Sequence, residues 1–164
     1  MIHILSGPVH SGKTSRLLQW AEGRSDLAGI ATPDQDGLKM LYDLKARRYF
    51  PFQMSEPYDP AVDSIGLGQY RFSDAAFLLA RQILDRAVQQ FPAWLIIDEI
   101  GPLELAGQGF EPAAGRIISQ YLQSGATSNL LLVIRDTILQ KAIEHYHITE
   151  FKNSTLVPES LCPY

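Results

Sequence analysis

The sequence has very little cysteine and no long apolar run. Among its 164 residues only Cys162 is a cysteine, which excludes an internal disulfide and a metal site built from several thiolates. No stretch approaches the roughly 18 consecutive apolar residues that span a membrane, and no charged segment followed by an apolar core opens the chain. We therefore expect a cytoplasmic protein with no membrane partner.

The sequence also lacks an excess of basic charge, internal repeats and low-complexity tracts. Lys and Arg number 14 against 18 Asp and Glu, giving a formal net charge of −4. Without a basic run there is no direct evidence for a nucleic-acid partner. The length fits one domain of ordinary size, and we predict a single domain over residues 1–164.

The most informative motif is GPVHSGKT at residues 7–14, which matches the phosphate-binding pattern G-x-x-x-x-G-K-[ST] and follows a short apolar run. The glycines let the backbone curl so that N–H groups point at phosphate oxygens, while Lys13 reaches the β- and γ-phosphates and Thr14 ligates Mg²⁺. The alternative is a glycine-rich turn before a helix. We predict that ATP or GTP binds here with Mg²⁺, against Gly7, Pro8, Val9, His10, Ser11, Gly12, Lys13, Thr14 and Ser15.

Apolar strands alternate with amphipathic helices along the chain, which predicts an α/β fold with a mostly parallel sheet and helices on both faces. Asp36-Gly37 is a strong turn signal and indicates a small inserted β-hairpin at about 33–52. The proline-rich segment at about 50–68 is typical of an irregular loop. We expect strands at 2–5, 27–32, 93–98, 129–134 and 147–151, and helices at 15–22, 74–90, from Pro112 to Gly125, and at 136–146.

A second motif, LIIDE at 95–99, ends the strand that we expect to be most buried. Asp98 is placed to hold Mg²⁺ through its water shell, and Glu99 to activate the attacking water as a general base. In parallel sheets, ligands bind at the carboxyl ends of the strands, where the loop at 7–14 also lies. The alternative is that both acids simply end a core strand.

Four stretches together resemble the THEP1-like nucleoside-triphosphatases: GPVHSGKTSRL, GIATPDQDG, QYRF at 69–72 and DEIGPLEL at 98–105. The resemblance covers most of the chain. It implies a three-layer P-loop NTPase with a RecA-like sheet, an additional strand between the two motif strands, and Mg²⁺-dependent hydrolysis of nucleoside triphosphates with loose base selectivity. The family's Glu-Val-Arg run after the second strand reads Asp34-Gln35-Asp36 here, so the basic residue expected near the phosphates is missing at that place.

Phosphoryl transfer needs a cation near the transferred group. Arg135, at the end of the strand 129–134, is the first candidate, with helix capping or pairing with Asp136 as its alternative. Arg47 and Arg48, beyond the hairpin, are the next candidates. Glu104 is expected either to brace the water or Lys13, or to be a solvated loop acid.

Two other functions stay open from the sequence. A small-molecule, nucleoside or nucleotide kinase would use Glu99 to deprotonate an acceptor hydroxyl. A nucleotide-dependent switch or partner-binding module would turn over slowly, and a protein partner or a second copy of the chain would then supply the missing cation.

Overall fold

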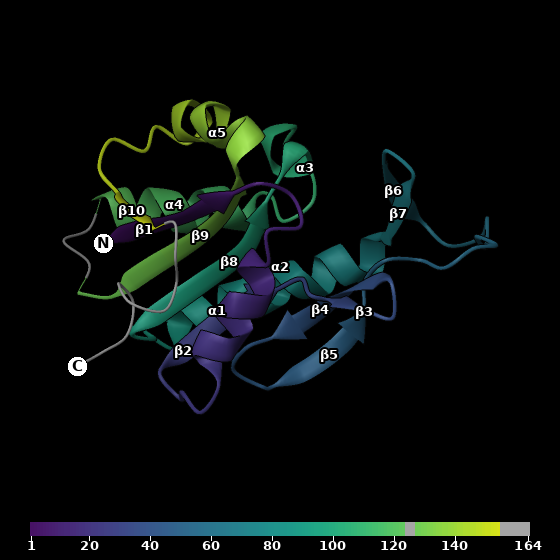
Figure 1. The fold of residues 1–164 in the computed structure, drawn as a ribbon, viewed down its shortest axis with the longest axis horizontal. Coiled ribbons are helices and arrows are strands. Elements are labelled where there is room, and N and C mark those ends of the chain that lie inside the picture. Colours follow the sequence, from purple (N-terminus) through teal and green to yellow (C-terminus); the bar gives the residue numbers. More distant parts are fainter. Residues whose placement is uncertain (124–126, 155–164) are drawn as a thin grey trace.

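The computed structural model describes residues 1–123 and 127–154, and an eight-stranded sheet forms its centre (Figure 1). The strand order is β10-β1-β9-β8-β2-β4-β3, and β5 pairs with β4. The strands are β1 (Ile2–Gly7), β2 (Leu27–Ala31), β3 (Asp34–Gln35), β4 (Leu38–Asp43), β5 (Arg48–Pro51), β8 (Trp94–Ile100), β9 (Asn129–Arg135) and β10 (Lys152–Ser154). The five strands from β10 to β2 are parallel, whereas β4 runs antiparallel to its neighbours.

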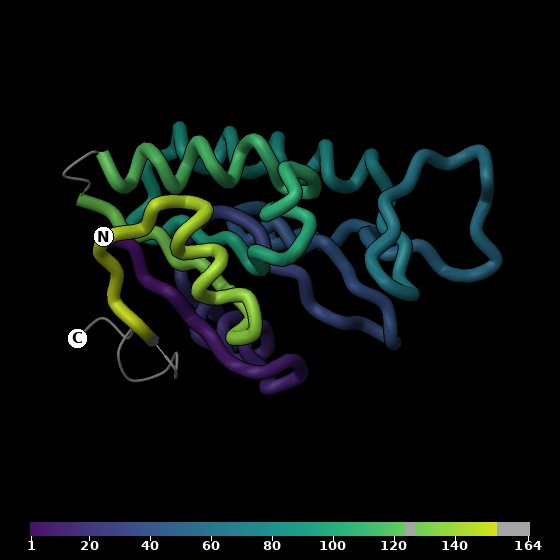
Figure 2. Tube along the Cα trace, turned by 90° about the horizontal axis from the view of Figure 1, so that it is seen from above, coloured from purple at the N-terminus to yellow at the C-terminus, as the bar shows by residue number. Residues whose placement is uncertain are grey.

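Helices cover both faces of this sheet. They are α1 (Lys13–Ala21), α2 (Asp74–Gln89), α3 (Pro102–Leu105), α4 (Ala113–Gln123) and α5 (Leu139–His145), the last preceded by a 3-10 turn, η1 (Asp136–Ile138). Ile4 belongs to the apolar cluster that includes α2, α4 and α5, while the next residue, Leu5, belongs to the cluster that includes Leu17 of α1. Figure 2 shows α2 and α4 side by side on one face. The predicted three-layer α/β architecture is therefore confirmed.

The order of the central strands places the two motifs. β9 lies between β1, which leads into the phosphate loop, and β8, which ends in the acidic motif. This is the additional strand that the resemblance implied. The inserted hairpin is also present: Gln35 pairs with Leu38 around Asp36 and Gly37, which both have positive φ, as a two-residue turn of the primed type requires.

Two predicted segments have different bounds in the structure. The loop at 50–68 begins in β5 and contains β6 (Ser64–Leu67), which forms a separate two-stranded sheet with β7 (Tyr70–Ser73). The last strand is not at 147–151, because Ile148 donates its backbone N–H to Ile143 at the end of α5, and the parallel pairing with β1 starts only at Lys152. The residue expected to close α4, Gly125, lies outside the described residues.

Candidate active site

The phosphate loop connects β1 to α1, and two of its residues have a positive φ. Gly7 ends β1, and α1 begins at Lys13. Gly12 has φ +78°, which a residue with a side chain adopts only at a cost, and His10 at the loop tip has φ +59°. A Cβ on Gly7 would lie 3.3 Å from the Ser11 hydroxyl. The loop is thus closely wound, and it leads directly into the N-terminus of α1.

The ammonium group of Lys13 is folded over the loop that it follows. It donates to the carbonyl oxygens of Gly7, at 2.8 Å, and Pro8, at 2.6 Å, and lies 3.4 Å from the Ser11 hydroxyl. These are exchangeable partners, because a phosphate oxygen offers the same ammonium a full negative charge.

Asp98 is fully buried at the end of β8. Its Oδ2 accepts the Thr32 backbone N–H at 3.3 Å, and Oδ1 has no hydrogen-bond partner among the described residues. Burial, reinforced by the neighbouring charge of Glu99, raises the pKa of Asp98 to about 6, while the Thr14 side chain, the Thr32 amide and Lys39 act in the opposite direction. The buried carboxylate therefore has one oxygen free for a ligand.

This oxygen and the Thr14 hydroxyl fit the protein side of a Mg²⁺ site. No group of three or more His, Cys, Asp or Glu that could hold a metal occurs among residues 1–123 and 127–154. Mg²⁺ is bound by one or two protein oxygens, with waters and substrate phosphates completing its shell. The donor set of one buried carboxylate and one hydroxyl at the start of α1 matches that pattern.

Glu99 and Arg135 form an ion pair, with 2.5 Å between Arg135 Nε and Glu99 Oε1. The pairing of β8 with β9 has a register shift between Asp98 and Ile100, close to this ion pair. Asp98 pairs with Val133 and Ile100 with Ile134, so Glu99 is an extra residue in β8. A bulge of this kind re-aims a side chain. Arg135 is therefore near the acidic motif, and its partner is Glu99, whereas Asp136 accepts the Thr137 N–H.

Lys39 also lies beside the acidic motif, although it was not a candidate from the sequence. It lies on β4 opposite Asp34, its Nζ is 3.4 Å from the carbonyl oxygen of Thr32, and it lines a cavity together with Glu99 and Arg135. A signal was present in the sequence. The turn at Asp36-Gly37 fixes the register of the hairpin, and that register places Lys39 beside the strand end of β2.

Glu104 is neither solvated nor a partner of Lys13. It is 3 % exposed, and its two oxygens accept the backbone N–H groups of Gly101, at 2.8 Å, and Phe110, at 3.0 Å. Burial raises its pKa to about 7, and the two amides partly oppose the shift. The carboxylate closes the segment 101–110 that follows β8, and this segment forms one wall of the cavity.

Arg47 and Arg48 are engaged elsewhere. Arg47 donates to the carbonyl oxygen of Arg24, at 3.1 Å, and Arg48 lies over the ring of Phe50. Both arginines thus contact groups outside the acidic motif.

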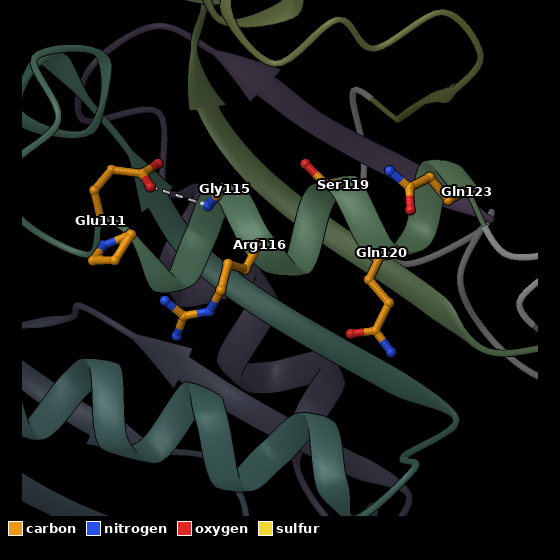
Figure 3. A pocket seen from close by; sticks show the side chains of 7 residues that line it. Glu111, Gly115, Arg116, Ser119, Gln120 and Gln123 are labelled. Atoms are coloured by element: carbon orange, nitrogen blue, oxygen red, sulfur yellow. Dashed lines mark hydrogen bonds between the residues drawn. The ribbon is translucent and has the colours of Figure 1, made fainter.

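The cavity beside Glu99 is small, at about 60 Å³. Its polar wall contains Thr32, Lys39, Glu99 and Arg135, and its apolar wall contains Phe52, Leu67, Phe72, Phe77, Pro102, Leu103 and Phe110. A larger open hollow of about 690 Å³ lies over α4 (Figure 3). There Glu111 bonds the Gly115 amide and Arg116 pairs with Asp85. The side chains drawn in Figure 3 point in different directions, so this hollow brings no catalytic groups together.

Two solved structures are similar to this chain over nearly its whole length. The crystal structure of THEP1 from the hyperthermophile Aquifex aeolicus matches with a TM-score of 0.71 and 21% identity, covering 97% of this chain and 91% of that one. The solution structure of a human cancer-related nucleoside triphosphatase matches with a TM-score of 0.61 and 20% identity, covering 96% and 89%. No family model and no curated sequence matches the chain. The chain therefore has a THEP1-like P-loop NTPase fold, as the sequence resemblance implied.

No helix among the described residues is both long and apolar enough to cross a bilayer.

Proposed function

We propose that this protein hydrolyses nucleoside triphosphates, ATP or GTP with loose base selectivity, to the diphosphate and inorganic phosphate in a Mg²⁺-dependent reaction. One observation carries the proposal: the loop at 7–14, the buried Asp98 and the Glu99–Arg135 pair all lie at the carboxyl ends of three neighbouring parallel strands. The names of the two structural neighbours, one of which is a nucleoside triphosphatase, agree with it.

The residues take the following roles. The loop amides and the N-terminus of α1 bind the phosphate chain, and Lys13 exchanges its two carbonyl partners for phosphate oxygens. Thr14 and Asp98 hold Mg²⁺, which when bound neutralises phosphate charge. Glu99 accepts a proton from a water molecule while the oxygen of that water bonds to the γ-phosphorus. The bond between the γ-phosphorus and the β–γ bridging oxygen breaks, and the diphosphate leaves. Arg135 holds the Glu99 carboxylate in place and adds positive charge beside it.

The size of the cavity supports water as the acceptor. A volume of about 60 Å³ beside Glu99 accommodates only a few water molecules. Transfer to a metabolite, as in a kinase, would need a larger space next to the same carboxylate. The presence of Arg135 within the same chain also reduces the need for a cation from a partner, which the slow-switch alternative assumes.

The proposal is tested by measuring phosphate release from ATP and GTP. Glu99→Gln is expected to retain nucleotide binding and to lower turnover by about 10² to 10⁴, the range for removal of a general base. Glu22→Gln, an exposed change just after α1, is the matched control. If Glu99→Gln released phosphate as fast as the unmodified protein, Glu99 would not be the base.

A further inference from the structure

The inserted hairpin places the ammonium group of Lys39 near Asp98, which lies close to the end of β8. Lys39 follows the Asp36-Gly37 turn on β4, and β4 pairs with both β3 and β2. Thr32, the residue after β2, connects the two groups: its backbone N–H bonds to the Asp98 carboxylate, and its carbonyl oxygen lies 3.4 Å from Lys39 Nζ. Lys39 and the buried Asp98 therefore contact the same residue, Thr32.

Lys39 lies beside the residues of the acidic motif. It lines the same small cavity as Glu99 and Arg135, and its charge acts on the Asp98 carboxylate. The site thus has positive groups on two sides, one at the end of β9 and one on the inserted hairpin.

The two cations are held differently. Arg135 contacts Glu99 at 2.5 Å. The ammonium of Lys39, by contrast, lies 3.4 Å from the Thr32 carbonyl and 3.5 Å from Asp34 Oδ2, and the Asp34 side chain is 57% exposed. Charge-assisted bonds of lysine are shorter, at about 2.7–2.9 Å. Lys39 is therefore loosely bound, and its flexible four-carbon stem lets the ammonium move to a stronger acceptor.

We infer that Lys39 binds the γ-phosphate of the nucleotide and offsets the negative charge that develops there, while Arg135 stays paired with Glu99. This inference rests on the proposed function and assigns the cation that the Asp34-Gln35-Asp36 segment does not provide. The hairpin is then part of the active site, and Lys39 is a residue that distinguishes a triphosphate from a diphosphate.

Two measurements on Lys39→Met test this, since methionine keeps most of the apolar stem and removes the charge. The first is turnover, for which we expect a loss of roughly 10- to 100-fold, the effect of removing one charged hydrogen bond. The second is the ratio of the dissociation constants for ADP and a non-hydrolysable ATP analogue, which should fall by a similar factor. Lys45→Met is the matched control, because Lys45 lies in the turn after β4 and its ammonium bonds the Ser25 carbonyl oxygen.

The outcomes separate this inference from the proposed function. If the unmodified protein releases phosphate and Lys39→Met leaves both quantities unchanged, Lys39 has no role and hydrolysis stands. If the unmodified protein releases no phosphate, hydrolysis fails, and the affinity ratio alone decides on Lys39. An equal loss in Lys45→Met would show a general charge effect and overturn the assignment. Lys39→Gln replaces Lys39→Met in both measurements if the latter does not fold, and Lys39→Arg should restore part of the loss.

Discussion

The guanidinium of Arg135, at the end of β9, lies 2.5 Å from the carboxylate of Glu99, near the end of β8. The two groups meet because the strands are parallel neighbours and because Glu99 is the extra residue at the register shift between Asp98 and Ile100. A carboxylate and a guanidinium held in one ion pair restrict each other's orientation, so Glu99 and Arg135 should act as a unit.

Removing either member of this pair should cost nearly as much as removing both. We expect Glu99→Gln and Arg135→Ala each to lower kcat by about 100-fold or more, and the double variant to be no slower than the more severe single variant. Steady-state phosphate release from the four proteins measures this cycle. Arg48→Ala is the control, because Arg48 lies over Phe50. Multiplicative losses in the double variant would show that the two residues act independently.

Asp98→Asn should weaken the binding of Mg²⁺ at the site. Asparagine still accepts the Thr32 N–H but lacks the charge, so the Mg²⁺ concentration for half-maximal turnover should rise by about 10- to 100-fold, as for residues that act through bound waters. Chelation with EDTA should abolish turnover, and added Mg²⁺ should restore it. Asp85→Asn, which affects a surface pair with Arg116, should leave the Mg²⁺ titration unchanged. An unaltered titration in Asp98→Asn would remove Asp98 from the metal site.

Gly109 and Gly107 offer a matched test of the Glu104 contacts. Both have positive φ, +63° and +73°, so alanine at either position is strained by about 1–2 kcal/mol. A Cβ on Gly109 would lie 2.1 Å from Glu104 Oε1, whereas one on Gly107 meets nothing within 4 Å. Gly109→Ala should therefore lower the free energy of unfolding by roughly 1–3 kcal/mol more than Gly107→Ala, because the carboxylate loses its amide partners. Equal losses in urea denaturation would contradict this.

Glu104 should also make stability depend on pH. Burial, with the Glu111 charge adding to it, raises the pKa of Glu104 from 4.5 to about 7 in the folded protein, and the Phe110 and Gly101 amides oppose this. The folded state then binds the proton more tightly than the unfolded state. The stability from this group is present below pH 4.5 and is lost as the pH rises through about 7.

Urea denaturation across this range provides the measurement. The free energy of unfolding of the unmodified protein should fall by a few kcal/mol as the pH rises, because each unit of pKa difference between the folded and unfolded states corresponds to about 1.4 kcal/mol. Glu104→Gln should be less stable at low pH, because its amide group cannot accept both backbone N–H groups, and its pH slope should be smaller. Tyr146 and Glu111, which bond each other beside this segment, are unchanged in that variant. Identical slopes would exclude Glu104 as the titrating group.

Local sequence patterns were sufficient for the parallel core and the first hairpin. The phosphate loop, the apolar run before Asp98 and the turn at Asp36-Gly37 each specify their structure within a few residues. The short strand β6 was missed, and the last strand was predicted at 147–151 instead of Lys152–Ser154, because their pairing depends on Tyr70–Ser73 and on β1 rather than on a local pattern. Strand propensity alone carries little information about such edges.

The site was predictable in its motifs but not in its partners. Arg135 was a candidate cation, yet its contact with Glu99 results from the register shift in β8. The burial of Glu104 depends on an amide six residues later, at Phe110, and the position of Lys39 depends on the pairing of β4 with β2. These relationships arise from tertiary packing, which a single sequence does not reveal.

The central claim is that water is the acceptor of the γ-phosphoryl group, and it can be tested directly by isotope transfer. The protein is incubated with ATP and Mg²⁺ in water enriched in heavy oxygen, and the released phosphate is analysed by mass spectrometry. We predict inorganic phosphate that carries one oxygen from the solvent, at a rate that Glu99→Gln reduces by about 10² to 10⁴. Absence of labelled phosphate, or its appearance at the same rate in Glu99→Gln, would contradict the proposed function.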